Sequence, residues 1–355
     1  APMTIGKTRY TAKKERREKR YETPFGPVKV ARYAYQSSAG GATLVPLGHN
    51  ARIIGGSTPR FAKLVSSKYS RNNAAAVQED LRESLHREVS RCYIQDISAL
   101  VAGGIGDKEQ VWDTAGDGPP PHGVASVGVG LDGVCMLFCE DGYRQAMVGT
   151  VTSYDAAGER LHTAYVAAAP EHGKGTFLGR MDGELARVKK RYPHARYVGV
   201  SDGAADFRPW LEKHTTTQVL DFWHLAEYLG AAAKIMFPRA APREEWLDDR
   251  LHSLKHKHGA ARAILAEIRE AADKERLGKA GRETLGATAR YMANNLKRTN
   301  YASYRKSHLP IGSGVTEAAC KTLVKSRMCG SGMTWTSDGA QSVLLLRAKW
   351  LTKGA

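Results

Sequence analysis

The chain has 355 residues, a formal net charge of +17 at pH 7 and an apolar fraction of 42%. This length predicts two or three domains with at least one sizeable core. The sequence has no apolar run long enough to cross a bilayer, and its basic N-terminus lacks the apolar segment of a secretory signal. These features argue against membrane and secreted proteins, so we expect a soluble cytoplasmic protein with no membrane partner.

The positive charge indicates what kind of partner the protein binds. An excess of Lys and Arg favours a polyanion, because binding neutralises phosphates and releases counterions, and nucleic acid is the leading candidate. An anionic membrane surface or simple solubility is the alternative. The cysteines form no Cys-x-x-Cys pair, so we expect reduced, mostly buried thiols, no structural zinc, and core packing of Cys135 and Cys139.

The first part of the chain, residues 1–55, is predicted to form a basic arm followed by a β-hairpin. Residues 1–36 are rich in Lys and Arg with few apolar anchors, which predicts a mobile arm lying on phosphate or a solvated tail. Residues 28–47 contain two strand-like segments about a Ser-Ala-Gly-Gly turn, a pattern typical of a hairpin.

Residues 56–103 are predicted to form a helix-turn-helix DNA-binding domain. Helices are expected from Pro59, over residues 74–84, and after Ser90, which would cap the third helix. The predicted inward faces consist of Phe61, Leu64, Val65 and Tyr69, of Val77 and Leu81, and of Tyr93, Ile94, Ile97 and Leu100. Arg91, Gln95 and Ser98 would then lie outside, where Arg and Gln can read guanine and adenine edges. Simple packing or a dimer contact is the alternative.

A linker rich in Gly, Pro and Asp is predicted over residues 104–123. After it, strand candidates at 124–132, 134–140, 143–155 and 159–168 indicate an antiparallel meander. Alternating helices and strands up to residue 237 then favour parallel pairing. Residues 238–309 read as an α-helical insertion domain, and residues 310–355 as further core helices. The fold class expected is therefore α/β, with a mixed sheet.

Three aspartates stand at predicted strand ends. Asp132 lies before a glycine at the end of an apolar strand, and Asp202 ends a buried parallel strand. Asp221 ends the next strand on the same edge, where open α/β sheets bind ligands. Taken singly, such aspartates are more often turn formers or helix N-caps than catalytic groups.

Glu317 lies in the first turn of a predicted helix, where the helix dipole favours its charged form. Lys321 and Lys325 follow at four-residue intervals. This spacing fits a carboxylate that binds a metal ion beside lysines that bind phosphate. A solvent-exposed i,i+4 salt bridge would have the same spacing and is the alternative.

Together the carboxylates and the order of elements match a ribonuclease H-like sheet. Phosphoryl transfer on DNA uses two metal ions about 3.5 to 4 Å apart. Carboxylates from separate elements can flank such a pair, and Mg²⁺ prefers these oxygen ligands.

The motifs VGLDGV, VSDGAADFRPW, VLDFWHLAEYL and IGSGVTEAACKTLVKSRMCGSGMTW resemble those of DDE-type insertion-sequence transposases, most closely the ISKra family, over residues 25–350. The resemblance implies that Asp132, Asp202 and Glu317 are the catalytic, metal-binding triad, with two Mg²⁺ ions that Mn²⁺ can replace. Asp221 and His224 match an Asp-x-x-His signature close to the active site of similar enzymes, which implies an accessory site; plain packing of His224 is the alternative.

Two residues of the long C-terminal motif are further candidates for DNA contact. Arg327 would contact the scissile phosphate, and Trp335 would stack on an unstacked base, since aromatic faces stack on bases. Core packing of Trp335 is the alternative.

The resulting hypothesis is a DNA transposase that binds terminal inverted repeats, cuts the strand and joins the 3′-hydroxyl to target DNA. Holding two DNA ends implies a homodimer or a larger oligomer. A structure-specific nuclease or resolvase of the same fold, and a domesticated DNA-binding regulator, are the competing hypotheses.

Overall fold

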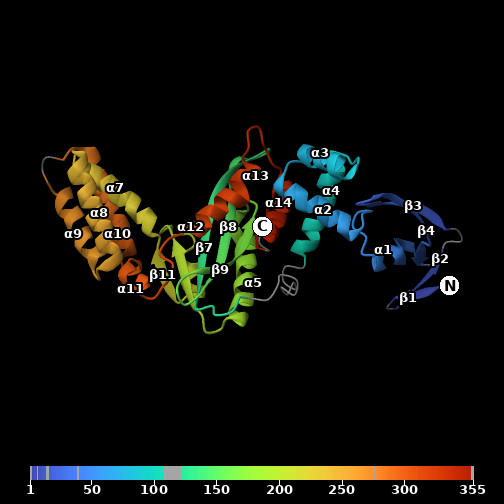
Figure 1. Cartoon of the computed structure of the whole chain (residues 1–355), viewed down its shortest axis with the longest axis horizontal. Helices are drawn as coiled ribbons and strands as arrows, with labels where there is room; N and C mark the ends of the chain where they lie inside the picture. Colours follow the sequence, from blue (N-terminus) through green and yellow to red (C-terminus); the bar gives the residue numbers. More distant parts are fainter. Residues whose placement is uncertain are drawn as a thin grey trace.

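The computed structural model describes residues 2–5, 7–12, 16–37, 40–107, 121–274 and 277–352. The described part is mixed α/β, the class that the sequence predicts, and 53% of it is helix and 23% is strand. Figure 1 shows a central sheet with a group of helices at one end and the N-terminal strands at the other.

The central sheet has five strands in the order β11-β10-β7-β8-β9. Their bounds are β7 (Ser126–Phe138), β8 (Gly142–Tyr154), β9 (Arg160–Ala168), β10 (Arg196–Ser201) and β11 (Thr217–Leu220). Strands β7, β8 and β9 form an antiparallel meander, and β7, β10 and β11 run parallel. Both the meander and the parallel pairing expected from the sequence are confirmed.

Strand β7 corrects one expectation. The two strand candidates around Asp132 and Gly133 are a single strand of 13 residues, so Asp132 does not lie at a turn. The ladder with β8 continues without a break through Asp132, which pairs with Val148, and Gly133, which pairs with Met147. Glycine suits this position because a Cβ at Gly133 would lie 2.6 Å from the side chain of Gln145.

The two faces of β7 pack against different helices. Val127, Val129 and Leu131 belong to a core with helix α5 (Gly175–Arg191). Val134 and Met136 belong to the core on the other face. Since side chains alternate along a strand, Asp132 lies on the same face as Val134 and Met136.

The core on that second face joins the sheet to helices at both ends of the sequence. These helices are α2 (Pro59–Arg71), α3 (Ala74–Leu85), α4 (Arg91–Gly106) and α14 (Ser337–Thr352). Phe61, Val77 and Ile94 are fully buried within it, together with Leu344 of α14. The helices at 59–106 therefore share one continuous hydrophobic core with the sheet.

Helix α4 begins as predicted, because the Ser90 side chain accepts a hydrogen bond from the Tyr93 amide at 3.1 Å. Its faces differ from the prediction at two positions. Ser98, expected outside, is fully buried, and Leu100, expected inside, is 53% exposed. The cause is the extra contact with α14, which places Ala102 and Ile105 in a second small core with Leu345. The predicted linker begins inside α4, and its residues 108–120 lie outside the described residues.

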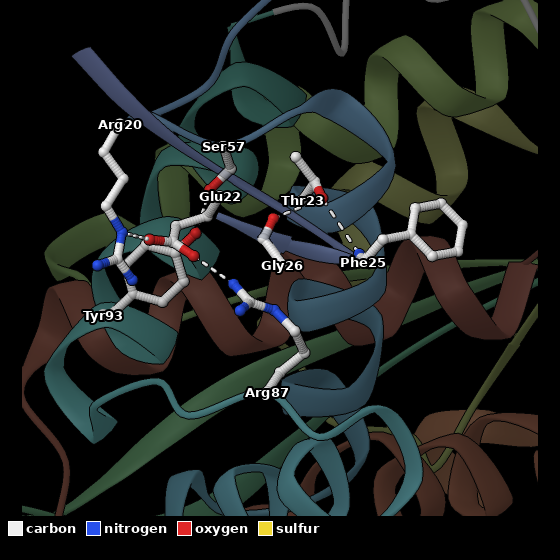
Figure 2. Close-up of polar contacts among 8 residues, drawn as sticks. All are labelled: Arg20, Glu22, Thr23, Phe25, Gly26, Ser57, Arg87 and Tyr93. Atoms are coloured by element: carbon white, nitrogen blue, oxygen red, sulfur yellow. Dashed lines mark hydrogen bonds and ion pairs between the residues drawn. The ribbon is translucent and has the colours of Figure 1, made fainter. Parts of the chain in front are cut away.

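The N-terminal region is not a mobile arm in its described part. It forms β1 (Met3–Ile5), β2 (Thr8–Ala12), β3 (Arg17–Thr23), β4 (Gly26–Arg32), β5 (Tyr35–Ser37) and β6 (Gly40–Leu44), followed by α1 (Pro46–Asn50). The predicted hairpin is confirmed only as β5 and β6, since β4 pairs with β3 instead. Tyr21 of β3 is buried. The Glu22 side chain also pairs with Arg87, which lies between α3 and α4 (Figure 2), and this contact holds β3 against the helices.

Beyond the sheet, the chain is helical, as expected. After α6 (Arg208–His214), the helical group at one end contains α7 (Phe222–Met236), α8 (Ala240–His256), α9 (Ala260–Ala272), α10 (Lys279–Asn295), η2 (Leu296–Arg298) and α11 (Tyr301–Lys306). The chain then returns to the sheet through α12 (Gly314–Ala319), η3 (Cys320–Lys325) and α13 (Ser326–Met328). Within the part of the chain described, every helix is too short or too polar to cross a membrane.

The cysteines are free thiols, but the expectation of mostly buried thiols is wrong. Only Cys320 is buried, whereas Cys135 and Cys139 are exposed. Cys135 lies on the face of β7 opposite to Val134 and Met136, and Cys139 lies in the turn that follows β7.

Candidate active site

Asp132 and Asp202 come from neighbouring parallel strands. Asp132 lies within β7, and Asp202 directly follows Ser201, the last residue of β10. The paired register of the two strands extends to Val200 and Gly130, so each aspartate lies two residues beyond this last pair. Asp202 is exposed, and its Oδ1 accepts a hydrogen bond from the Ala204 amide at 2.8 Å, as in an Asx turn.

Glu317 is carried to the same face by helix α12, whose first turn contains it. The neighbouring Thr316 packs directly on β7, where a Cβ at Gly130 would lie 2.1 Å from its Oγ1. The Thr316 hydroxyl also hydrogen-bonds the Thr150 hydroxyl of β8 at 2.7 Å. Glycine at 130 therefore allows the close approach that brings Glu317 over the strand of Asp132.

Asp221 is joined to Glu317 by the hydroxyl of Ser313. Ser313 Oγ lies 2.6 Å from Glu317 Oε1 and 2.5 Å from Asp221 Oδ2. Asp221 is also the N-cap of α7, with its Oδ1 accepting from the Trp223 amide at 2.9 Å. Burial raises the pKa of the Asp221 carboxyl, the hydrogen bonds from Ser313 and Trp223 lower it, and the charge of Glu317 raises it.

Two further side chains connect the carboxylates. The buried thiol of Cys320 donates to Asp132 Oδ2 at 3.4 Å. Burial raises the pKa of this thiol, and the charges of Asp132 and Glu317 raise it further. Burial likewise raises the pKa of Tyr291, and the nearby charges of Asp202 and Asp221 add to the effect.

The Tyr291 hydroxyl donates to the Asp202 carbonyl at 2.6 Å. The Ser313 hydroxyl joins Glu317 to Asp221, and the Cys320 thiol contacts Asp132, whereas Tyr291 contacts Asp202 at its main-chain carbonyl.

A buried cation lies behind this negative group. Arg298 donates to the Ser201 hydroxyl at 3.3 Å, one residue before Asp202, and is 8% exposed. Burial lowers the pKa of its guanidinium, and the neighbouring Arg208 lowers it further. Arg298 belongs to the helical region between the second and third predicted catalytic carboxylates, so that region supplies a positive charge to the site.

The helix after Glu317 contains a π-helical turn, η3, and such turns occur often at functional sites. Buried Arg347 of α14 holds two carbonyls of this turn, because its Nε donates to Leu323 at 2.6 Å and its Nη2 donates to Thr322. Its Nη1 donates to the Ser70 carbonyl of α2 at 2.6 Å. Lys321 and Lys325 remain exposed on this helix, next to the carboxylates.

The donor set suits a hard divalent cation, because it consists of carboxylate oxygens. The Ser313 hydroxyl has one hydrogen and can donate to only one of the two carboxylates that it contacts. A cation bound at the other carboxylate would stabilise the remaining contact between two oxygens. Among the described residues, no three His, Cys, Asp or Glu side chains lie close enough together to hold a metal ion. In the part of the chain that the structure describes, the predicted ligands Asp132, Asp202 and Glu317 therefore do not converge on one point.

The predicted DNA-contacting residues fall into two groups. Arg91 and Gln95 are exposed on the first turns of α4, and Arg91 Nε donates to Gln78 Oε1 at 3.4 Å. The prediction for Arg327 does not fit this geometry, because its side chain is buried, donates to the Tyr69 carbonyl and lies over the Trp335 ring. Trp335 packs on the same core, and its Nε1 donates to the Met328 carbonyl at 2.8 Å, which favours packing over base stacking.

His224 follows Asp221 by three residues and is half-buried on α7. The two residues of the predicted accessory site therefore differ in their contacts. Asp221 lies among the carboxylates, whereas no hydrogen bond joins the His224 side chain to another described residue.

Sequence reasoning did not single out Ser313, Cys320, Tyr291 or Arg298. Ser313 and Cys320 belong to the motif that contains Glu317, so their spacing from Glu317 is a usable signal. Tyr291 and Arg298 lie in a helical region without a motif, and only their packing on Ser201 and Asp202 reveals them.

A scan against models of known protein families finds no match for this chain, and a search of curated proteins finds no relative. Its function is therefore argued from its own residues and their arrangement.

Proposed function

We propose that this protein is a DDE-type DNA transposase with a ribonuclease H-like core. The observation that carries the proposal is the placement of three carboxylates. Asp132 and Asp202 each lie two residues beyond the last pair of the β7–β10 ladder, and α12, which carries Glu317, packs on β7 at Gly130. The strand order, an antiparallel meander followed by two parallel strands on its first-strand edge, supports the same fold.

The chemistry proposed is phosphoryl transfer on DNA. When bound, Mg²⁺ ions would activate the attacking water or 3′-hydroxyl and stabilise the leaving oxygen, with Mn²⁺ as a substitute. Asp132, Asp202 and Glu317 would provide the oxygen ligands. Ser313 holds the carboxylate of Glu317 in place, and the exposed ammonium groups of Lys321 and Lys325 lie where they can bind DNA phosphates.

DNA recognition is proposed for the helices before the sheet. α2, α3 and α4 would act as a helix-turn-helix unit, with exposed Arg91 and Gln95 reading bases of the terminal repeats in the major groove. The region 238–309 would serve as an insertion domain that closes over the carboxylates. Because two DNA ends must be held together for transposition, the active form is proposed to be a dimer or a larger oligomer on DNA.

The test is an assay of DNA cleavage and strand transfer with Mg²⁺, using duplexes that carry the ends of the element. The proposal predicts both cut and joined products for the wild type. Asp202→Asn should lower the rate by at least about 100-fold, because the loss of one oriented charge at the site costs several kcal/mol in the transition state. Full activity of Asp202→Asn would overturn the triad assignment. Cutting without joining would favour a nuclease or resolvase, and DNA binding without cutting would favour a regulator.

A further inference from the structure

The hairpin formed by β3 and β4 presents an aromatic side chain to solvent at its tip. Phe25 is 88% exposed and follows Pro24 in the turn between the strands. In Figure 2 its ring points away from the polar cluster of Arg20, Glu22 and Arg87. Single exposed apolar side chains are common on protein surfaces. The rigid backbone and the basic residues around the ring distinguish Phe25 from such side chains.

The tip is held rigidly in this arrangement. The Thr23 hydroxyl donates to the Gly26 carbonyl at 2.7 Å and accepts from the Phe25 amide at 3.1 Å (Figure 2). Gly26 has a φ of +128°, a conformation that L side chains rarely adopt. These constraints fix the backbone on both sides of Phe25, so little conformational entropy is lost when the ring meets a partner.

The hairpin is also fixed to the body of the protein close to its tip. The Glu22 amide donates to the Gly56 carbonyl, and the Thr58 amide donates to the Glu22 carbonyl, both at 2.9 Å. The Glu22 carboxylate pairs with Arg87, whose side chain is 6% exposed. Phe25 is thereby held at the N-terminal end of α2, beside the three helices proposed to bind DNA.

The surroundings of Phe25 carry positive charge. Arg20 and Lys29 are direct cross-strand partners, as are Arg17 and Arg32, and opposed like charges destabilise a hairpin unless an anion lies between them. Arg20 is compensated by Glu22 at 2.8 Å, but Lys29 forms no ion pair with any residue that the structure describes. The guanidinium of Arg60 lies 5.9 Å from the centre of the Phe25 ring.

We infer that the β3–β4 hairpin binds duplex DNA through the minor groove, where Phe25 inserts as a wedge between two base pairs and kinks the duplex. Lys29 and Arg60 bind the phosphates on either side. DNA fits this surface because base pairs offer flat apolar faces within reach of a phosphate backbone, and apolar wedges on basic elements kink DNA in this way. The inference deepens the proposed function and rests on its DNA-binding part alone.

The test uses the full chain and a short duplex of mixed sequence with a fluorescent donor and acceptor at its ends. Wild-type protein should increase energy transfer by bending the duplex. Phe25→Ala should weaken binding by roughly 5- to 100-fold and abolish the increase, since one aromatic contact with a base has about this effect. Phe25→Trp should retain both. Tyr143→Ala is the matched control, because Tyr143 is a second exposed aromatic, 76% exposed, near the turn between β7 and β8.

Charge-removing variants test the phosphate contacts. Lys29→Gln and Arg60→Gln should each reduce the slope of log affinity against log salt concentration by about one, because each removes one phosphate contact. Slopes equal to the wild-type value would contradict this assignment.

The inference fails if Phe25→Ala binds and bends DNA as the wild type does, or if Tyr143→Ala loses as much affinity as Phe25→Ala. Loss of self-association in Phe25→Ala with unchanged DNA binding would assign the ring to a protein contact and also overturn it. These results are independent of catalysis. Unchanged DNA bending by a protein that cuts no DNA would refute the transposase proposal but not this inference, whereas a chain that binds no duplex would refute both.

Discussion

Asp221 is a buried carboxylate whose ionisation the fold opposes. Burial raises its pKa, so the folded protein holds a proton on this group more tightly than the unfolded chain does. The bound proton of Asp221 therefore contributes to the free energy of unfolding at acidic pH, below the pKa of the unfolded chain. This contribution is lost as the pH rises through the raised pKa of the folded protein. An uncharged side chain of the same shape would avoid this loss and could still accept the hydrogen bond from the Trp223 amide.

Asp221→Asn is therefore expected to melt at a higher temperature than the wild type at neutral pH with a chelator present. The difference should vanish below about pH 4, where both side chains are neutral. Differential scanning calorimetry across this pH range provides the measurement. A lower melting temperature for the variant at neutral pH would show that the charged form of Asp221 is the stabilising one.

For single residues, the sequence pointed to the acidic side chains but not to the Ser313 and Cys320 side chains that contact them. Strand-end position selected Asp202 and Asp221, and motif context selected Glu317. Asp132 was also selected as a strand-end residue, although it lies inside β7. The hydroxyl of Ser313 and the thiol of Cys320 act through contacts with distant parts of the chain, which local patterns do not encode. For the same reason, the buried place of Arg327 could not be inferred from its basic motif.

Helix α12 depends on a glycine in the strand beneath it. A Cβ at Gly130 would lie 2.1 Å from Thr316 Oγ1 and 3.2 Å from Thr316 Cβ, which is closer than packed atoms allow. Gly130→Ala should therefore destabilise the fold by about 1 to 3 kcal/mol, the usual cost of overpacking, and displace Glu317.

Truncation of the Thr316 side chain should reduce the destabilisation that Gly130→Ala causes. In a double-mutant cycle measured by urea unfolding, Gly130→Ala should cost less in a Thr316→Ala background than in the wild type. Equal costs in the two backgrounds would show that α12 does not press on the strand at this point. The loss of the hydrogen bond to Thr150 belongs to Thr316→Ala alone and cancels in the cycle.

The sequence largely predicted which segments are helices and which are strands. It did not predict every point at which one element ends and the next begins. Periodicity located α5, α7 and the strands of the sheet within a few residues. It divided β7 at Asp132 and Gly133 because a glycine after an aspartate usually marks a turn. The unbroken ladder with β8 overrides that local preference.

For the whole molecule, packing joins segments that the sequence separates widely. One core contains Phe61 near the start of the chain, Val134 of the sheet and Leu344 near the end. Composition predicted that such a core would exist and that the surface would be basic. It could not show that α14 packs against both the helices at 59–106 and the sheet, because this depends on long-range contacts.

The central claim is that Asp132, Asp202 and Glu317 together hold the metal ions for DNA cleavage. The most direct measurement is anomalous X-ray diffraction from crystals of the protein with Mn²⁺. We predict two anomalous peaks about 3.5 to 4 Å apart, coordinated by these three carboxylates. The claim would be contradicted if Mn²⁺, at a concentration that supports DNA cleavage, bound elsewhere and left the three carboxylates without a metal ion.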